Sequence, residues 1–153
     1  MTKLSADLGR TLSTQIAAAP SASAAMDLVV ATLKREFRNY DWVGIYLLDG
    51  DELVLGPFLG APSPHTRIPL NRGICGAAAS QKETIVVDDV NSDPRYLACS
   101  LQTKSEIVVP IMRGDAVFGE IDIDSHTPAA FGDTDRATLE QIAEALAEKI
   151  VDG

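Results

Sequence analysis

Aliphatic and acidic side chains alternate near the end of the chain, and the alternation predicts a β-strand with two chemically different faces. The run is Glu120-Ile121-Asp122-Ile123-Asp124. Because successive side chains of a strand point to opposite sides of a sheet, the isoleucines share one face and the carboxylates share the other. We therefore expect helices to pack against the isoleucine face.

Two further segments alternate in the same way. Their aliphatic sets are Val43, Ile45 and Leu47 in the first segment, and Ile107, Val109 and Ile111 in the second. The opposite face then gathers two aromatic rings and three carboxylates, namely Trp42, Tyr46, Glu106, Asp122 and Asp124. Such a face resembles a cup for a small cation with an apolar part. The alternative is a solvent-exposed acidic face, but a large ring such as Trp42 seldom faces water without a purpose.

One geometric condition governs this shared face. The segments 106–112 and 116–124 form a predicted hairpin around Arg113-Gly114-Asp115. Glu106 joins the face of Asp122 and Asp124 only if it pairs with an even-numbered residue of the last strand. That pairing requires a loop of odd length or a β-bulge near Gly114.

The remaining pattern predicts an α+β fold. Apolar spacing and capping residues indicate helices over 4–19, from a cap at Ser21 or Ser23 to about residue 37, over 73–81 and over 134–151. Further strands are expected over 41–48, 52–55, 66–70 and 84–87, with a connection over 56–64 and a long loop over 88–104. This order favours a single domain over 1–153, with helices on one face of a mostly antiparallel sheet and a ligand pocket on the other.

Charge and hydropathy exclude several classes of function. The chain has 153 residues and a formal net charge of −9. A strongly acidic protein repels phosphate backbones, so we expect no nucleic-acid partner. No apolar run reaches the roughly 20 residues of a membrane span, and the segment 1–7 lacks the apolar core of a signal peptide. We therefore expect a cytoplasmic protein with no membrane partner.

The chain has only two cysteines, Cys75 and Cys99, and both lie in segments with loop-like sequences. In a reducing compartment two cysteines suit a transient, catalytic disulfide better than a permanent one. Arg72 and a helix start beside Cys75 favour its thiolate, provided that the thiol is partly exposed. Two buried structural thiols are the alternative. A zinc site made of both cysteines with His65 and His126 matches no known ligand spacing, so we expect no metal.

Several short segments, taken in order, carry a family resemblance. They are Asp41-Trp42-Val43-Gly44-Ile45-Tyr46-Leu47-Leu48, Leu53-Val54-Leu55-Gly56-Pro57-Phe58, Arg67-Ile68-Pro69, Arg72-Gly73-Ile74-Cys75-Gly76, Ala98-Cys99, Ser105-Glu106-Ile107-Val108-Val109-Pro110-Ile111 and Ile121-Asp122-Ile123-Asp124-Ser125. Together they resemble the free methionine-(R)-sulfoxide reductases, which are stand-alone GAF-domain enzymes. The resemblance covers nearly the whole chain and implies a GAF-like fold.

The resemblance also implies a role for each candidate residue. Cys99 would attack the sulfoxide sulfur as a thiolate, and Cys75 would resolve the resulting sulfenic acid as a Cys75–Cys99 disulfide. Carboxylates that share a pocket cannot all stay ionised, so one of them, for which we favour Glu106, would donate a proton to the sulfoxide oxygen. The substrate would be held by the carboxylates and aromatic rings, namely Glu106, Asp122, Asp124, Trp42 and Tyr46.

The implied substrate is free methionine-(R)-sulfoxide, and the implied reductant is thioredoxin or a similar protein, with no cofactor. The chain departs from the family at one position. Many members have a cysteine two residues before Arg-Ile-Pro, whereas this chain has His65 there. Two other functions remain as alternatives: a non-catalytic GAF module that senses a small ligand, and a scaffold that forms a homodimer through its first and last helices.

Overall fold

The computed structural model describes residues 2–96 and 102–152, so Cys99 lies outside the described residues. Its centre is a six-stranded antiparallel sheet in the order β3-β2-β1-β6-β5-β4. The strands are β1 (Trp42–Asp49), β2 (Glu52–Leu59), β3 (Arg67–Pro69), β4 (Ile85–Val87), β5 (Ser105–Arg113) and β6 (Ala116–Ser125). The helices are α1 (Thr2–Ala18), α2 (Ala22–Glu36), α3 (Gly73–Gln81) and α4 (Asp133–Asp152), with a 3₁₀ turn over Val90–Ser92.

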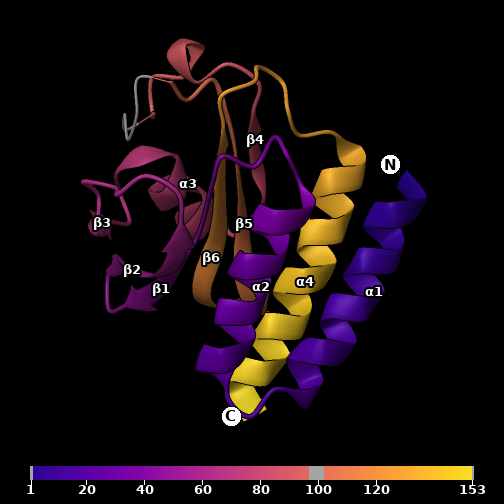
Figure 1. Cartoon of the computed structure of the whole chain (residues 1–153). Helices are drawn as coiled ribbons and strands as arrows, with labels where there is room; N and C mark the ends of the chain where they lie inside the picture. The colour runs from indigo at the N-terminus through magenta and orange to yellow at the C-terminus, as the bar shows by residue number, and fades with distance from the viewer. Residues whose placement is uncertain (1, 97–101, 153) are drawn as a thin grey trace.

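Three helices, α1, α2 and α4, form a layer on one face of the sheet, with α1 lying along α4 (Figure 1). The apolar core between this layer and the sheet includes Val43, Ile45, Ile121 and Ile123, all fully buried. Burying one such side chain contributes about 1.5–3 kcal/mol. The predicted packing of the aliphatic strand faces on helices is therefore confirmed. Among the described residues no helix is long and apolar enough to cross a membrane.

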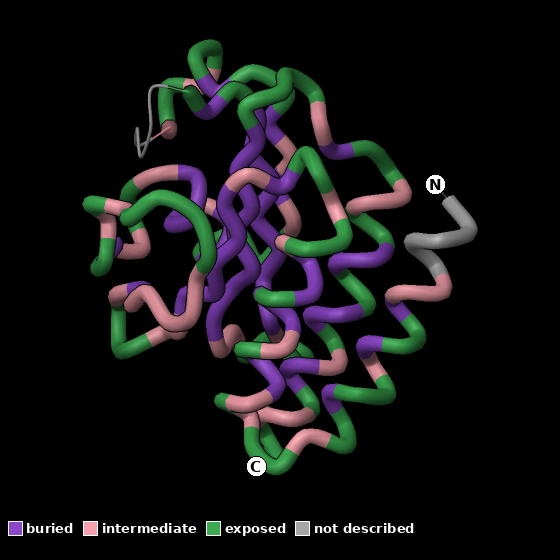
Figure 2. Tube along the Cα trace, viewed as in Figure 1, coloured by how far each residue is buried: buried purple, intermediate pink, exposed green. Residues whose placement is uncertain are grey.

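The opposite face of the sheet is covered in part by α3. Ile74 and Ala78 of this helix pack with Trp42, Tyr46 and Val108 in a second apolar cluster. Figure 2 shows that buried residues run through the middle of the sheet, while the outer surfaces of the covering segments are exposed. The face that carries the candidate site residues is thus an interior layer of the protein, between the sheet and α3.

The predicted α+β fold and the bounds of α3 are confirmed, but one predicted boundary is wrong. The segment expected as a connection over 56–64 begins with four further residues of β2, which ends at Leu59. β2 pairs with β3 only over Glu52–Val54. Pro57 therefore lies where β2 has no second neighbour, at a sheet edge that tolerates the missing N–H of proline.

Candidate active site

The register between β5 and β6 brings the candidate carboxylates onto one face. Glu106 pairs with Asp124, and Val108 pairs with Asp122. Near the turn, Met112 pairs with Val117, and the register then shifts by one residue. Without this shift, continuing the pairing from the turn would place Glu106 opposite an isoleucine. The condition derived from the sequence is met by a bulge, and the prediction that these carboxylates share a face is confirmed.

Glycine is required next to this bulge because β6 approaches β1 closely. A Cβ atom built on Gly119 would lie 2.2 Å from the carbonyl oxygen of Tyr46. Such a contact is far inside van der Waals distance, so any larger residue would push the two strands apart. Gly119 therefore helps to fix the register that puts the acidic residues on the α3 side of the sheet.

The carboxylates are buried rather than solvated. The exposed fraction is 5% for Glu106, 3% for Asp122, 3% for Asp124 and 0% for Glu120. Both carboxylate oxygens of Glu120, and one oxygen each of Asp122 and Asp124, have no hydrogen-bond partner among the described residues. The alternative of a solvent-exposed acidic face is therefore wrong. Buried polar atoms without partners are rare and call for a functional explanation.

Burial of four carboxylates close together changes the protonation of this cluster. Burial raises the pKa of Glu106 well above its usual range, and the negative charges of Asp122 and Asp124 raise it further. Burial also raises the pKa of Glu120, Asp122 and Asp124. Like charges in a low-dielectric space cannot all ionise, so the cluster holds at least one proton near neutral pH. It can therefore both donate a proton and bind a cation.

Cys75 is the third residue of α3, and its thiol donates a hydrogen bond to Oδ2 of Asp122 at 3.4 Å. It is 6% exposed. Burial raises the pKa of this thiol, and the charges of Asp122, Glu120 and Glu106 raise it further. The expectation of a partly exposed Cys75 that favours thiolate is thus wrong: burial and the charges of three carboxylates outweigh the helix start and Arg72.

The two predicted aromatic residues lie beside the carboxylates and hold the segment 60–66 over them. Trp42 donates from Nε1 to the carbonyl oxygen of Ala61 at 2.9 Å, and the hydroxyl of Tyr46 donates to the carbonyl oxygen of His65 at 2.7 Å. Their ring centroids are 6.4 Å apart. Gly44 between them leaves room for the indole, because a Cβ there would lie 2.3 Å from Cη2 of Trp42.

Two small cavities flank the carboxylates. One of about 20 Å³ is lined by Cys75, Glu106, Asp122 and Tyr46, together with half-buried His65. The other, of about 90 Å³, is lined by residues that include Trp42, Asp124 and His126. The first has room for about one water molecule. In this conformation the site is closed, since pockets for small molecules usually measure about 300–1,000 Å³.

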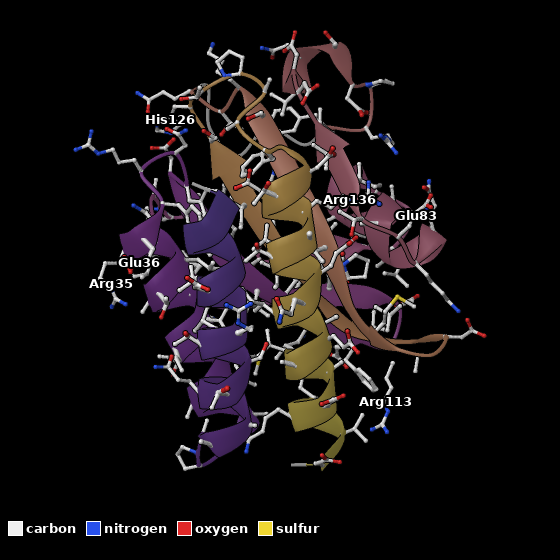
Figure 3. The ribbon with its side chains drawn as sticks, turned by 90° about the vertical axis from the view of Figure 1, so that its right-hand side faces the viewer. Arg35, Glu36, Glu83, Arg113, His126 and Arg136 are labelled. Atoms are coloured by element: carbon white, nitrogen blue, oxygen red, sulfur yellow. The ribbon has the colours of Figure 1, made fainter. Side chains whose placement is uncertain are left out.

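A larger hollow of about 510 Å³ lies elsewhere, between α4 and the β5–β6 turn, and none of the predicted site residues lines it. Figure 3 shows Arg136, Glu83 and Arg113 on that side of the molecule. Its lining mixes both signs of charge. Nε of Arg136 lies 3.2 Å from Oε2 of Glu140, and the same oxygen accepts a hydrogen bond from the hydroxyl of Thr84. Arg136 and Glu140 neutralise one another and are both exposed, so this part of the hollow has the character of a solvated surface.

Sequence reasoning missed one member of the site. Glu120 lies on the same face as Asp122 and Asp124, and its charge acts on the thiol of Cys75. The two-residue spacing of the carboxylates contained the signal. The position of Cys99 relative to this cluster lies outside the described residues, so the Cys75–Cys99 pairing stays a prediction.

Three comparisons with known proteins agree on the kind of protein. The family model of the GAF domain matches residues 21–150. The free methionine-R-sulfoxide reductase of Escherichia coli (strain K12) is 35% identical over 150 residues, which cover 98% of this chain and 90% of that protein. GAF domain-containing protein A of Dictyostelium discoideum is 44% identical over 119 residues, 77% of this chain and 74% of that protein.

Solved structures agree with these sequences. The free methionine-R-sulfoxide reductase of Neisseria meningitidis, in complex with its substrate, is 37% identical and superposes with a TM-score of 0.92 over 98% of this chain and 90% of that chain. The reduced form of the Staphylococcus aureus protein fRMsr is 36% identical, with a TM-score of 0.88 over 95% of this chain and 94% of that chain.

Proposed function

This chain belongs to the GAF-domain family of free methionine-R-sulfoxide reductases, and from this membership we propose that it reduces free methionine-(R)-sulfoxide to methionine. The observation that supports the proposal most is the buried cluster on the α3 side of the sheet. It places a thiol 3.4 Å from a carboxylate oxygen, among carboxylates without full sets of partners. Such a cluster suits a reaction that needs a proton, a thiol and a bound ammonium group.

The carboxylates have two roles in the proposal. Asp122 and Asp124 accept charge-assisted hydrogen bonds from the ammonium group of the substrate. Glu106 keeps its proton because burial and the two aspartates raise its pKa. It therefore donates this proton to the sulfoxide oxygen as the reaction begins. Trp42 and Tyr46 line the space for the apolar S-methyl end of the substrate.

The first chemical step transfers oxygen from sulfur to sulfur. The thiolate of Cys99 attacks the sulfoxide sulfur and forms an S–S bond, while Glu106 protonates the sulfoxide oxygen. This S–S bond and the S–O bond of the substrate then break as the hydroxyl passes to Cys99, where a new S–O bond forms. The substrate sulfur gains two electrons and becomes the thioether of methionine. The sulfur of Cys99 loses two electrons and becomes a sulfenic acid.

The second step regenerates the dithiol by way of a disulfide. The sulfur of Cys75 attacks the sulfenic acid of Cys99, a disulfide forms and water leaves. Asp122 accepts the hydrogen bond of the Cys75 thiol and is placed to take its proton. A thiol with a raised pKa is a poor first nucleophile, which supports Cys75 as the resolving residue and Cys99 as the attacking one. Thioredoxin or a similar dithiol then reduces the disulfide.

Substrate entry requires the site to open. The two flanking cavities measure about 20 and 90 Å³, which is less than a small-molecule pocket needs. The segment 60–66 covers them and is held by the hydrogen bonds from Trp42 to Ala61 and from Tyr46 to His65. We propose that this segment moves outward to admit the substrate.

A stereospecific assay tests the function. Purified protein is mixed with each epimer of free methionine sulfoxide and a dithiol reductant, and methionine is measured over time. We expect turnover of the R epimer and little or none of the S epimer. Equal turnover of both epimers would contradict the assignment. Binding of the R epimer without any turnover would favour the alternative of a GAF sensor.

Two cysteine variants separate the roles of the thiols. Cys99→Ser should release no methionine even in a single turnover, since a serine hydroxyl is a poor nucleophile toward sulfur. Cys75→Ser should release about one methionine per chain and then stop with a sulfenic acid on Cys99, because the resolving thiol is gone. Mass spectrometry of the wild type after substrate should detect the Cys75–Cys99 disulfide. A first turnover kept by Cys99→Ser and lost by Cys75→Ser would reverse the two roles.

A further inference from the structure

Three side chains around the smaller cavity have the chemistry of a metal-binding site. The sulfur of Cys75 and one carboxylate oxygen each of Glu106 and Asp122 all lie within 4.8 Å of one another. All three residues line the cavity of about 20 Å³. A volume of this size holds one water molecule or one ion. This set differs from the histidine and cysteine set that the sequence brought into consideration.

The spacing of two of these atoms already matches that of ligands on one ion. Zinc binds thiolate sulfur at about 2.3 Å and carboxylate oxygen at about 2.0 Å in tetrahedral geometry, which separates the sulfur and oxygen by about 3.5 Å. The sulfur of Cys75 and Oδ2 of Asp122 are 3.4 Å apart. A carboxylate oxygen of Glu106, within 4.8 Å of the sulfur of Cys75 and of an oxygen of Asp122, supplies the third ligand, and water would supply a fourth.

A second, independent observation points to a ligand in this place. Oδ1 of Asp122 has no hydrogen-bond partner among the described residues, although the side chain is only 3% exposed and lines the cavity. Both oxygens of Glu120, which is fully buried but does not line this cavity, also lack a partner among the described residues. No lysine or arginine of the described part of the chain forms an ion pair with these carboxylates. A cation in the cavity would supply the missing partner.

We propose that this cavity binds a divalent cation of the Zn²⁺ class through Cys75, Glu106 and Asp122, and that the bound ion excludes the sulfoxide substrate. On binding, the S–H bond of Cys75 breaks, its proton leaves to solvent and a sulfur–metal bond forms, with no change of oxidation state. The thiolate ligand favours Zn²⁺ over Mg²⁺ or Ca²⁺, which prefer sites made of oxygen alone. The binding stands on its own, whereas the inhibition rests on the proposed function.

Calorimetric titration of the reduced protein with Zn²⁺ tests the site. The wild type should bind one ion. Cys75→Ser should weaken binding by on the order of 100-fold or more, since even the loss of an outer-shell partner costs about 10–100-fold. Asp122→Asn should also weaken it. A matched control should leave it unchanged: His126→Ala removes an exposed histidine whose Nδ1 lies 3.7 Å from Oδ1 of Asp41.

Cobalt provides a readout that does not depend on any variant folding. Co²⁺ added to the wild type should give the thiolate-to-metal charge-transfer absorption of a sulfur ligand, and Mg²⁺ in excess should not displace it. Absence of this band, or Zn²⁺ binding that survives Cys75→Ser and disappears with His126→Ala, would overturn the proposal.

The inhibition is measured separately, as loss of methionine formation in Zn²⁺ and its recovery with a chelator. Protein that binds Zn²⁺ through Cys75 but never turns over substrate would contradict the proposed function and keep the metal site. Protein that turns over substrate and binds no Zn²⁺ would contradict the metal site alone. Turnover that stays unchanged with the site filled would overturn the claim that the ion excludes the substrate.

Discussion

The two faces of β6 bury their side chains equally but in opposite chemical surroundings. Ile121 and Ile123 are fully buried in the apolar core that the sheet shares with α2 and α4. Asp122 and Asp124, at the intervening positions, are each 3% exposed beneath α3 and the segment 60–66. The helix-facing side stabilises the fold by removing apolar area from water. The α3-facing side costs stability because carboxylates lose their hydration without gaining full sets of partners.

This difference indicates where the sheet supports the fold and where it supports a reaction. A protein under selection for stability alone would place apolar residues on both faces of a doubly covered sheet. Here one face keeps four buried acidic groups and a thiol in contact with them. Perturbed titratable groups of this kind gather at functional sites.

Truncation on the helix-facing side should reduce stability most. Ile123→Ala removes a fully buried side chain from the aliphatic core, so the free energy of unfolding should fall by about 2–5 kcal/mol. Chemical denaturation measures this loss. Substrate affinity of the fraction that stays folded should be unchanged, because this side chain points away from the carboxylates. A stability loss below about 1 kcal/mol would mean that the two faces do not differ as described.

The β-bulge that sets the register of β5 and β6 should be sensitive to a single added methyl group. Gly119→Ala places a Cβ 2.2 Å from the carbonyl oxygen of Tyr46, which should cost about 1–3 kcal/mol of stability and lower turnover as the register is disturbed. Gly114→Asn is the matched control. Gly114 has a φ of +60°, a backbone conformation that Asn tolerates. Nothing lies within 4 Å of a Cβ added there. Equal effects of the two variants would argue against a register fixed at Gly119.

Neutralising a carboxylate on the α3-facing side should increase stability at neutral pH. Burial raises the pKa of Glu120 well above its usual range. Above the ordinary pKa of a carboxyl group, the unfolded chain releases a proton that the folded chain keeps. Stability therefore falls as pH rises toward the raised pKa, by up to about 1.4 kcal/mol per pH unit for this group.

Glu120→Gln should remove this contribution, so the advantage of the variant over the wild type should grow as pH rises above about 4.3. Denaturation curves across this range, recorded with a chelator present, measure the difference. Glu83→Gln, a change at an exposed position, is the matched control. A constant difference between Glu120→Gln and the wild type at all pH values would contradict a raised pKa of Glu120.

Much of this arrangement could be predicted from the sequence because it follows from period-two alternation. The alternation assigned Trp42, Glu106 and Asp122 to one face, and the parity of the hairpin required the bulge that the structure contains. The same alternation places Glu120 on this face, beside Asp122 and Asp124. These features are local in sequence, so neighbouring residues are enough to define them.

The environment of Cys75 could not be predicted in this way, because it depends on long-range packing. The sequence around Cys75 contains Arg72 and a helix start, which favour a thiolate. The carboxylates that reverse this effect come from β5 and β6, and Asp122 is 47 positions away along the chain. The extension of β2 to Leu59 has a similar cause, since Pro57 is tolerated only because β3 is short.

A calorimetric titration of free methionine-(R)-sulfoxide into Cys99→Ser protein, which lacks the proposed attacking thiol, tests whether the acidic face beneath α3 binds the substrate. One site should be filled, and adding Asp122→Asn should weaken binding by about 1.5–3 kcal/mol, or roughly 10–150-fold, the loss expected for one charged hydrogen bond. Adding Glu83→Gln instead should leave the affinity unchanged. Equal affinity with and without Asp122→Asn would contradict the claim that the acidic face beneath α3 binds the substrate.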